Sequence, residues 1–365
     1  MAVVGTGLVG GSIALGLKAR GHRERIVGYD RDRDALRRAR ERGAIDVAVG
    51  VPEDAVRDAD IVVLAVPVDR IPAACARLAG AVRRDAVVTD VGSAKGAVVR
   101  AGGRGFGGRF VGGHPMAGSE RHGIEAADPD LFVDAWWMLT PTSETSPTAY
   151  ATVSALVQAL GARPVAVDPE AHDALVARLS HVPQLTASAL VASAVAESDG
   201  DAPQWLAARG FRDVTRIAAS DPELWVAIIR SNRAAVAGAL ERLRDTLESV
   251  ARAVEDERWG ELESFLERAR AARLERFAKP RGPDEPVAVV VLIPDRPGVL
   301  AEVTTAAGEL GVNIEDLRLV HSTEGGRGRL ELVVDGTAAA EALSGALRAR
   351  GYRPTIVAVD VSTDP

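Results

Sequence analysis

Histidine is scarce in this sequence, and one histidine stands in a setting suited to proton transfer. Six histidines occur among the 365 residues, and His114 lies between Gly113 and Pro115 in the segment Val111–Glu120. Imidazole titrates near neutral pH, so a positioned histidine can take a proton from a substrate hydroxyl. The glycines of this segment predict a loop that can hold the ring at a cleft. Taken alone, a loop histidine is more readily explained as a surface residue, so neighbouring motifs have to decide its role.

A glycine-rich turn near the N-terminus has the pattern of a dinucleotide-binding loop. The stretch Gly5-Thr6-Gly7-Leu8-Val9-Gly10 matches G-x-G-x-x-G between a short apolar run and a helical stretch. In such turns the first glycine makes the turn, the second lets the backbone approach a pyrophosphate, and the third lets helix and strand pack closely. Asp30 stands 20 residues after Gly10, where a carboxylate can bind ribose hydroxyls. The alternative is a structural turn with a surface aspartate.

Asp30 also bears on the choice of cofactor. A carboxylate at this position repels the 2′-phosphate of NADP, which favours NAD. Arg31 follows it directly and is able to accept that phosphate. We therefore predict NAD as the cofactor, with NADP as the alternative.

Two further segments follow predicted strands, where ligands of a doubly wound sheet bind. The first ends at Val66 and Pro67, and the second begins at Asp90 and contains Ser93. Ser93 is explained either as a helix N-cap or as a hydroxyl near the nicotinamide. No histidine or cysteine stands at metal-ligand spacing, so no metal is expected.

Composition restricts the class of protein. Hydrophobic residues make up 47% and charged residues 26%, and the net charge is −7, which predicts a soluble globular chain without affinity for nucleic acid or anionic lipid. The longest apolar runs, such as Ile61–Val68, are shorter than a membrane span needs. The single cysteine, Cys75, precludes an internal disulfide and suits the cytoplasm. Arginine supplies 41 of the 44 basic residues, so spacing alone does not select Arg216 within Gly210–Ser220.

The elements that position these residues fall into three predicted domains. Residues 1–167 alternate short β-rich runs with helical stretches, which predicts a parallel, doubly wound α/β sheet. Residues 168–280 are rich in alanine, leucine, arginine and glutamate with helical spacing of apolar residues, so we expect a helical domain. A proline-rich linker, Ala278–Pro286, then precedes residues 286–361. There the expected order β-α-β-β-α-β is that of a ferredoxin-like fold.

The motifs in combination resemble the prephenate dehydrogenase family over residues 1–280. The matching segments are Gly5–Gly10, Asp90–Gly96, Gly113–Glu120, His172–Gln184 and Gly210–Trp225. Residues 286–361 resemble an ACT domain, whose typical features are the loop Asp295–Leu300 and Asn313. The resemblance implies a Rossmann-like NAD domain, a helical domain for substrate binding and dimerisation, and a regulatory domain.

The resemblance also implies a reaction and residue roles. Hydride leaves C4 of a cyclohexadienyl acid for NAD while the ring carboxylate departs as CO2, and prephenate gives 4-hydroxyphenylpyruvate in tyrosine biosynthesis. Such chemistry requires a base for the 4-hydroxyl and a cation for the ring carboxylate. The family pattern assigns the base to His114, the hydroxyl contact to Ser93 and the carboxylate contact to Arg216. The pattern assigns further positions on the substrate side to Ser119, Glu120, His172 and Asp173.

One departure from the family pattern concerns the substrate side chain. Members often have S-H-L-P-H where this chain has Ser180-His181-Val182-Pro183-Gln184, so the second histidine, a substrate contact in the family, is Gln184 here. Glutamine carries no charge, which makes arogenate the alternative to prephenate, with use of both possible. His181 and Gln184 are both expected substrate contacts. The helical domain and the resemblance favour a homodimer.

Two other functional classes share part of this set of motifs. A Rossmann dehydrogenase for β-hydroxyacids or imines shares the glycine turn but does not explain His114 together with Arg216. A non-catalytic sensor that binds NAD would show a broken catalytic set, whereas His114, Ser93 and Arg216 are all present. Both classes are therefore disfavoured.

The C-terminal domain is expected to sense an amino acid. Asp295 and Gly298 turn the chain into a predicted helix, whose N–H groups can take a carboxylate, and Asn313 follows at the next strand. L-Tyrosine, the end product of the pathway, is the expected allosteric effector. Phenylalanine, tryptophan or a purely structural role are the alternatives.

Overall fold

The computed structural model describes residues 1–118, 121–196, 209–276, 286–294, 296, 298–321 and 327–358. Three predicted site residues, Ser119, Glu120 and Asp295, lie outside the described residues. The chain divides into two compact units, residues 1–248 and 249–365. Each unit is described by itself.

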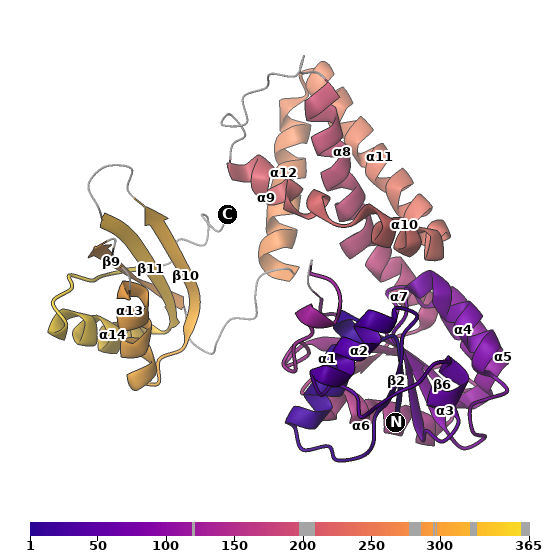
Figure 1. Ribbon diagram of the computed structural model, residues 1–365. Coiled ribbons are helices and arrows are strands. Elements are labelled where there is room, and N and C mark those ends of the chain that lie inside the picture. The colour runs from indigo at the N-terminus through magenta and orange to yellow at the C-terminus, as the bar shows by residue number, and fades with distance from the viewer. Residues whose placement is uncertain are drawn as a thin grey trace. The chain divides into compact units, whose positions relative to one another are not determined.

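An eight-stranded sheet forms the centre of the first unit (Figure 1). Its strands are β1 Ala2–Val4, β2 Val27–Tyr29, β3 Val47–Ala48, β4 Ile61–Leu64, β5 Val87–Asp90, β6 Phe110–Pro115, β7 Trp136–Thr140 and β8 Arg163–Ala166. The spatial order is β3-β2-β1-β4-β5-β6-β7-β8. The first six strands are parallel and have the order of a Rossmann fold.

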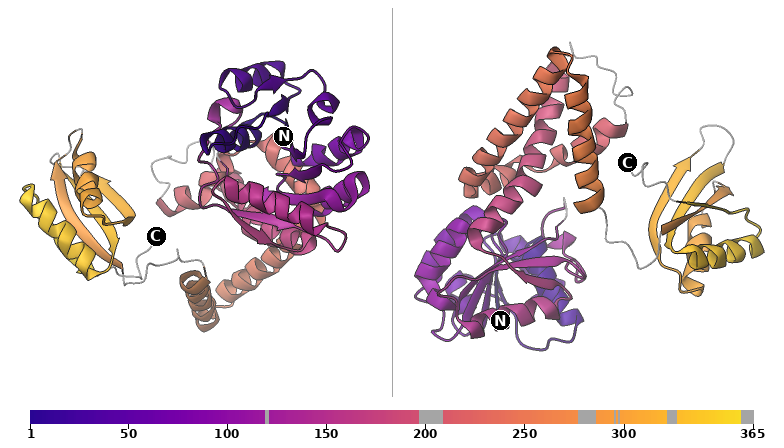
Figure 2. Two further views of the ribbon diagram at one scale, coloured as in Figure 1. Left: turned by 90° about the horizontal axis from the view of Figure 1, so that it is seen from below. Right: turned by 180° about the vertical axis from the view of Figure 1, so that it is seen from behind.

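Helices cover both faces of this sheet (Figure 2). They are α1 Leu8–Ala19, α2 Arg33–Glu41, α3 Pro52–Val56, α4 Ile71–Leu78, α5 Gly96–Phe106 and α6 Pro147–Ala159, with short 3₁₀ turns η1 Val68–Arg70, η2 Gly107–Arg109 and η3 Ile124–Ala126. Along β4 the side chains alternate between the two cores. Val62 and Leu64 pack with α4 and α5, whereas Val63 packs with α1 and α6. Burial on both faces explains why the central strands β1 and β4 are continuous apolar runs in the sequence.

The sequence prediction for the His114 segment was wrong in its local structure. Phe110–Pro115 is a strand rather than a glycine-rich loop, and it pairs antiparallel with β7, with His114 opposite Met138. The glycines allow close packing: a Cβ on Gly112 would lie 2.4 Å from Thr140 Oγ1, and one on Gly113 would lie 2.7 Å from the Asp90 carbonyl oxygen. The sheet is therefore mostly, not entirely, parallel.

Helices follow the sheet, as the sequence predicts for residues after 167. They are α7 Pro169–Val176, a π-helical turn η4 Ala177–His181, α8 Val182–Ala196, α9 Arg209–Thr215, the 3₁₀ turn η6 Arg216–Ala219, α10 Pro222–Ser231, α11 Arg233–Glu255 and, in the second unit, α12 Trp259–Arg276. Asp168 caps α7 by accepting hydrogen bonds from the N–H groups of Glu170 and Ala171. The helical spacing of apolar residues continues through 224–253, but the structure has two helices there, α10 and α11, which are separated at Asn232.

One described helical stretch, Pro169–Ala196, is long and apolar enough to cross a membrane by length and composition. Its most apolar window has a mean hydropathy of 1.2, and 22% of that window is buried. The stretch carries the buried His172 and His181. Ala177 and Val182 also pack into a core cluster with Val236 of α11. It therefore packs as a core helix along part of its length.

The second unit contains a four-stranded antiparallel sheet with two helices (Figure 1). Its elements are β9 Pro286–Pro294, α13 Val299–Glu309, β10 Ile314–His321, β11 Arg327–Asp335, α14 Thr337–Ala349 and β12 Thr355–Ala358, with strand order β10-β11-β9-β12. Val289, Val291 and Ile293 of β9 alternate toward a core shared with Val303 of α13 and Leu343 of α14. This element order is the one that the sequence predicts.

Candidate active site

The glycine turn after β1 has the geometry that a dinucleotide requires. Gly5 has φ +99°, and a Cβ there would lie 2.3 Å from the Ala65 carbonyl oxygen. A Cβ on Gly10 would lie 2.0 Å from the Gly5 carbonyl oxygen, whereas one on Gly7 would meet nothing within 4 Å. Gly5 and Gly10 are therefore required by the packing of the turn, and Gly7 leaves open space for a ligand.

The N-terminus of α1 is suited to a phosphate. Gly7 is the N-cap of this helix, and no side chain caps it. The first N–H groups of a helix lack partners within the helix, and they carry partial positive charge. A pyrophosphate accepted at this turn would satisfy them, which fits the geometry of the three glycines.

Asp30 joins the end of β2 to the glycine turn. Its Oδ2 accepts hydrogen bonds from the Thr6 N–H at 2.7 Å and from Thr6 Oγ1 at 3.3 Å, and its Oδ1 accepts one from the Asp32 N–H at 3.0 Å. Carboxylate oxygens have about four lone-pair sites in all, so acceptor capacity is left for ribose hydroxyls.

A cavity of about 650 Å³ is lined in part by residues that follow strands β2 and β4. Arg31, Pro67 and Arg70 of the sheet domain line one side of it, and Leu224 and Arg230 of α10 line the other. Val66, which precedes Pro67, is half-buried and packs against the core. The cavity thus brings the predicted cofactor-side segments together with a helix of the following domain.

Asp90 and Lys95 form a buried ion pair beside the strand that carries His114. Both side chains have 0% exposure, and Lys95 Nζ binds Asp90 Oδ2 and donates to the Gly113 carbonyl oxygen at 2.7 Å. The Asp90 carboxylate also accepts from the N–H groups of Gly92 at 2.7 Å and Gly113 at 3.1 Å. These bonds fix the loop that carries Ser93 against the strand that carries His114. The Asp90 side chain is fully engaged within the protein, and its part in cofactor binding stays a prediction.

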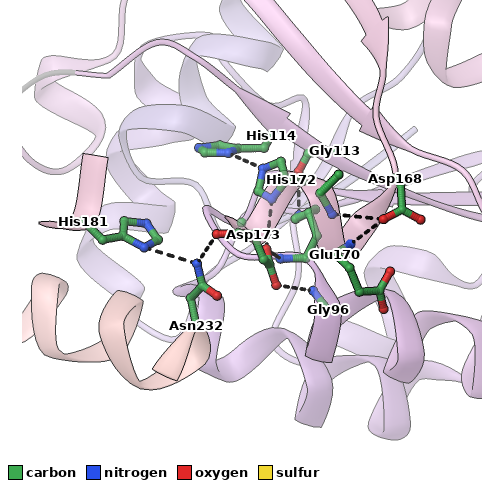
Figure 3. Close-up of polar contacts among 12 residues, drawn as sticks. Gly96, Gly113, His114, Asp168, Glu170, His172, Asp173, His181 and Asn232 are labelled. Atoms are coloured by element: carbon green, nitrogen blue, oxygen red, sulfur yellow. Dashed lines mark hydrogen bonds and ion pairs between the residues drawn. The ribbon is translucent and has the colours of Figure 1, made fainter. Parts of the chain in front are cut away.

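His114 is the outer member of a chain of three hydrogen-bonded side chains (Figure 3). Its Nδ1 lies 2.9 Å from His172 Nε2, and His172 Nδ1 lies 2.9 Å from Asp173 Oδ1. Asp173 also accepts hydrogen bonds from the N–H groups of Lys95 at 2.6 Å and Gly96 at 2.8 Å. Because a carboxylate only accepts, His172 donates from Nδ1; a neutral His172 has its single ring proton there, so its Nε2 accepts and His114 donates from Nδ1. The lone pair of His114 then lies on Nε2.

The surroundings keep His114 neutral. Burial, followed by the positive charges that His172, Lys95 and His181 carry when protonated, holds the pKa of His114 well below its usual range. Burial alone raises the pKa of Asp173, but hydrogen bonds from His172 and from the Lys95 and Gly96 N–H groups outweigh it, so that pKa is lowered. A neutral imidazole backed by an ionised carboxylate is the arrangement of a general base.

A second buried histidine lies on the π-helical turn η4. His181 is 2% exposed, and its ring lies edge-on to Trp225 with centroids 6.0 Å apart. Burial lowers the pKa of His181 to about 4, against the opposing charge of Asp173. Its Nδ1 lies 3.3 Å from Nδ2 of Asn232, which also donates to the Asp173 carbonyl oxygen at 2.8 Å. Asn232 was not predictable from the sequence, because a lone asparagine between helices carries no local signal.

The remaining predicted site residues lie on three different elements. Ser93 is half-buried in the loop after β5, and Gln184 is 5% exposed on α8, one helical turn beyond His181. Arg216 is exposed on η6, which packs against α8. His114, His172, Asp173 and His181 are joined in one network through Asn232. Roles for Ser93, Gln184 and Arg216 in substrate binding stay predictions.

A turn built for a dinucleotide and a neutral, carboxylate-backed histidine at the carboxyl end of the sheet define the class: this is an oxidoreductase of the Rossmann type. Comparison with known proteins extends the assignment. The family model "Prephenate dehydrogenase, nucleotide-binding domain" matches residues 13–166, and "Prephenate dehydrogenase, dimerization domain" matches residues 168–268.

Individual relatives agree with these models. The chain is 32% identical to the prephenate dehydrogenase of Bacillus subtilis (strain 168), over 90% of both chains. It is similar to the crystal structure of Aquifex aeolicus prephenate dehydrogenase in complex with hydroxyphenyl propionate and NAD+, with TM-score 0.71 and 32% identity over 75% of this chain and 96% of that one. Synechocystis arogenate dehydrogenase matches with TM-score 0.68 and 33% identity, over 76% of this chain and 99% of that one. The chain belongs to the prephenate dehydrogenase family and is an NAD-dependent oxidoreductase.

Proposed function

We propose that this enzyme converts prephenate to 4-hydroxyphenylpyruvate and CO2. The observation that carries the proposal is the neutral His114, hydrogen-bonded through His172 to Asp173. The Bacillus subtilis relative, which is similar over 90% of the chain, supports prephenate as the substrate. Bound NAD supplies the hydride acceptor.

His114 is proposed to take the proton of the substrate's 4-hydroxyl at its Nε2. As it does so the imidazole becomes positively charged, and the bond from its Nδ1 to His172 strengthens because one partner is now ionised. Asp173 stabilises that charge through His172. When C4 loses its hydride and the ring carboxylate leaves as CO2, the ring becomes aromatic. His114 then returns its proton to the phenolic oxygen, so no net proton is consumed.

His172 and Asp173 act in this proposal behind the base rather than as direct substrate contacts. His172 is fully buried, and both of its ring nitrogens have protein partners. Each Asp173 carboxylate oxygen likewise accepts a backbone hydrogen bond. Direct contacts are assigned to Ser93 for the 4-hydroxyl and to Arg216 for the ring carboxylate.

Arogenate is the second candidate substrate. The chain is 33% identical to Synechocystis arogenate dehydrogenase, and the buried residue one turn beyond His181 is the uncharged Gln184. An amide can serve either the pyruvyl group of prephenate or the amino-acid group of arogenate, because it both donates and accepts. Side-by-side kinetics with prephenate and arogenate, each with NAD and NADP, decide between them. A higher kcat/KM for arogenate would overturn the choice of prephenate.

A homodimer formed through the helices is proposed as the working state. Large apolar side chains remain exposed on α8 and α11 of the first unit, including Leu190 at 43%, Val195 at 65% and Leu247 at 56%. Exposed apolar side chains on adjacent helices favour association. The matched family model is described as a dimerization domain. Sedimentation of the full chain tests this, and a monomer at micromolar concentration would refute it. A cytoplasmic location stays a prediction.

The C-terminal sheet is proposed to be an ACT domain that senses L-tyrosine. Its element order β-α-β-β-α-β and antiparallel sheet support this. Gly298 has φ +89° at the start of α13, which no side chain caps, and Asn313 Nδ2 donates to Glu315 Oε1 at 2.5 Å. Tyrosine should inhibit the full chain, and Gly298→Val should abolish inhibition while sparing kcat. Equal inhibition of a chain that ends at Lys279 would place tyrosine in the active site instead.

A further inference from the structure

Asn232 occupies a buried junction between two helices. It follows α10 and precedes α11, with φ −119° and ψ 30°, and its side chain is 5% exposed. A buried amide requires hydrogen-bond partners, because an unsatisfied polar group costs about 1–3 kcal/mol. Its partners are therefore informative about why an asparagine stands here.

The contact with Asp173 fixes the orientation of the Asn232 amide. The amide atom 2.8 Å from the Asp173 carbonyl oxygen must be the NH2 group, because a carbonyl oxygen only accepts. The reversed amide would place two acceptors against each other. The hydrogen-bond partner therefore determines which atom of the Asn232 amide is the nitrogen and which is the oxygen.

The same NH2 group fixes the tautomer of His181. Nδ2 lies 3.3 Å from His181 Nδ1, and it can only donate there. Nδ1 must then carry the lone pair, and the single ring proton of neutral His181 must be on Nε2. A protonated ring would set its Nδ1–H against the amide N–H, so the contact also disfavours the charged form.

The other groups around His181 have opposing effects on its charge. Asp173 favours the imidazolium, whereas His172 disfavours it, and Trp225 presents a ring edge without charge. Burial is the largest influence and lowers the pKa of His181 to about 4. At neutral pH the ring is therefore an uncharged donor.

We propose that Asn232 is a positioning residue that holds His181 as the neutral Nε2–H tautomer, so that His181 donates a hydrogen bond to an anionic or carbonyl oxygen of the substrate. The proposal rests on the proposed function, and it takes His181 as the substrate contact that the family resemblance implies. The tautomer itself is a property of the free protein and is testable without turnover.

The experiment is nitrogen-15 NMR of the full chain labelled at histidine. The chain contains six histidines, and His181→Gln identifies the His181 signals by their loss. In the wild type at pH 7 we expect a protonated Nε2 and an unprotonated Nδ1, with titration near pH 4. A protonated Nδ1, or a charged ring at pH 7, would overturn the proposal from the wild-type spectrum alone.

Asn232→Asp tests the cause. A carboxylate can accept from Nδ1–H, and an adjacent opposite charge raises a histidine pKa by about one to three units. An unchanged His181 pKa in a folded Asn232→Asp protein would refute the role of the amide. Ser231→Ala is the matched control, since Ser231 Oγ bonds only the Ala227 carbonyl oxygen among the described residues. This variant should leave His181 unchanged.

Kinetics separate this role from a structural one. Asn232→Leu removes the amide without adding charge, so it should raise KM for the substrate about ten-fold with little change in kcat. A fall in kcat at unchanged KM would mean that Asn232 acts through Asp173 and the base, contrary to the proposal. If the wild type fails to oxidise prephenate, the proposed function fails, whereas the tautomer result stands separately.

Discussion

The hydrogen bonds that join His114 to His172 and Asp173 allow a quantitative prediction for the variant His172→Phe. The substitution keeps an aromatic ring in a fully buried position but removes the acceptor that lies 2.9 Å from His114 Nδ1. Before proton transfer that contact joins two neutral groups, and such a hydrogen bond contributes about 0.5–1.5 kcal/mol. After proton transfer His114 is charged, and the same bond contributes about 1.5–3 kcal/mol.

Only the difference between these states accelerates the chemical step. A difference of about 1–2 kcal/mol corresponds to a five-fold to thirty-fold loss of kcat in His172→Phe. The assay is NADH formation at saturating substrate and NAD, with the dissociation constant of NAD measured separately and expected to be unchanged. His22→Phe is the matched control, because His22 pairs with Glu24 at 2.9 Å in a loop before β2 and should not affect kcat. A kcat within two-fold of wild type for His172→Phe would refute the reasoning.

Five further outcomes are expected. His114→Asn should keep NAD binding and lower kcat by about 10²–10⁴-fold, the usual contribution of a positioned base. In the wild type, log(kcat/KM) should stay level as the pH falls through 6.5, because the pKa of His114 is lowered. Arg216→Gln should raise KM by about ten-fold to a hundred-fold through loss of a charge-assisted bond, which initial-rate kinetics will measure. Asp30→Ser should narrow the preference for NAD over NADP in kcat/KM, because it removes repulsion of the 2′-phosphate. The pKa of His181 is about 4 in the folded protein, below its ordinary value of 6.5, so the unfolded chain binds this proton more tightly. The free energy of unfolding should therefore fall as the pH is lowered from 6.5 to 4, which denaturant titrations will measure.

Local patterns in the sequence were sufficient for much of the fold. The glycine turn was predictable because its glycines are required by local geometry: Gly5 has a positive φ, and Gly10 lies too close to the Gly5 carbonyl oxygen for a side chain. Strand β4 was predictable because burial on both faces requires an uninterrupted apolar run. Each of these two signals is contained within a few consecutive residues of the chain.

The features that the sequence did not predict depend on contacts between distant segments. The strand that carries His114 was mistaken for a loop, because glycines needed for packing against Thr140 and Asp90 look the same in sequence as glycines needed for turning. The place of His172 behind His114 depends on a contact across 58 positions. Asn232 has no motif around it, and its role became visible only from its partners Asp173 and His181.

The most direct test of the central claim is product analysis with prephenate labelled at the ring carboxylate. We expect the full-length enzyme with NAD to release one labelled CO2 and form one 4-hydroxyphenylpyruvate for each NADH, and His114→Asn to slow all three together. Formation of NADH without labelled CO2, or no reaction with prephenate while arogenate yields tyrosine, would contradict the account.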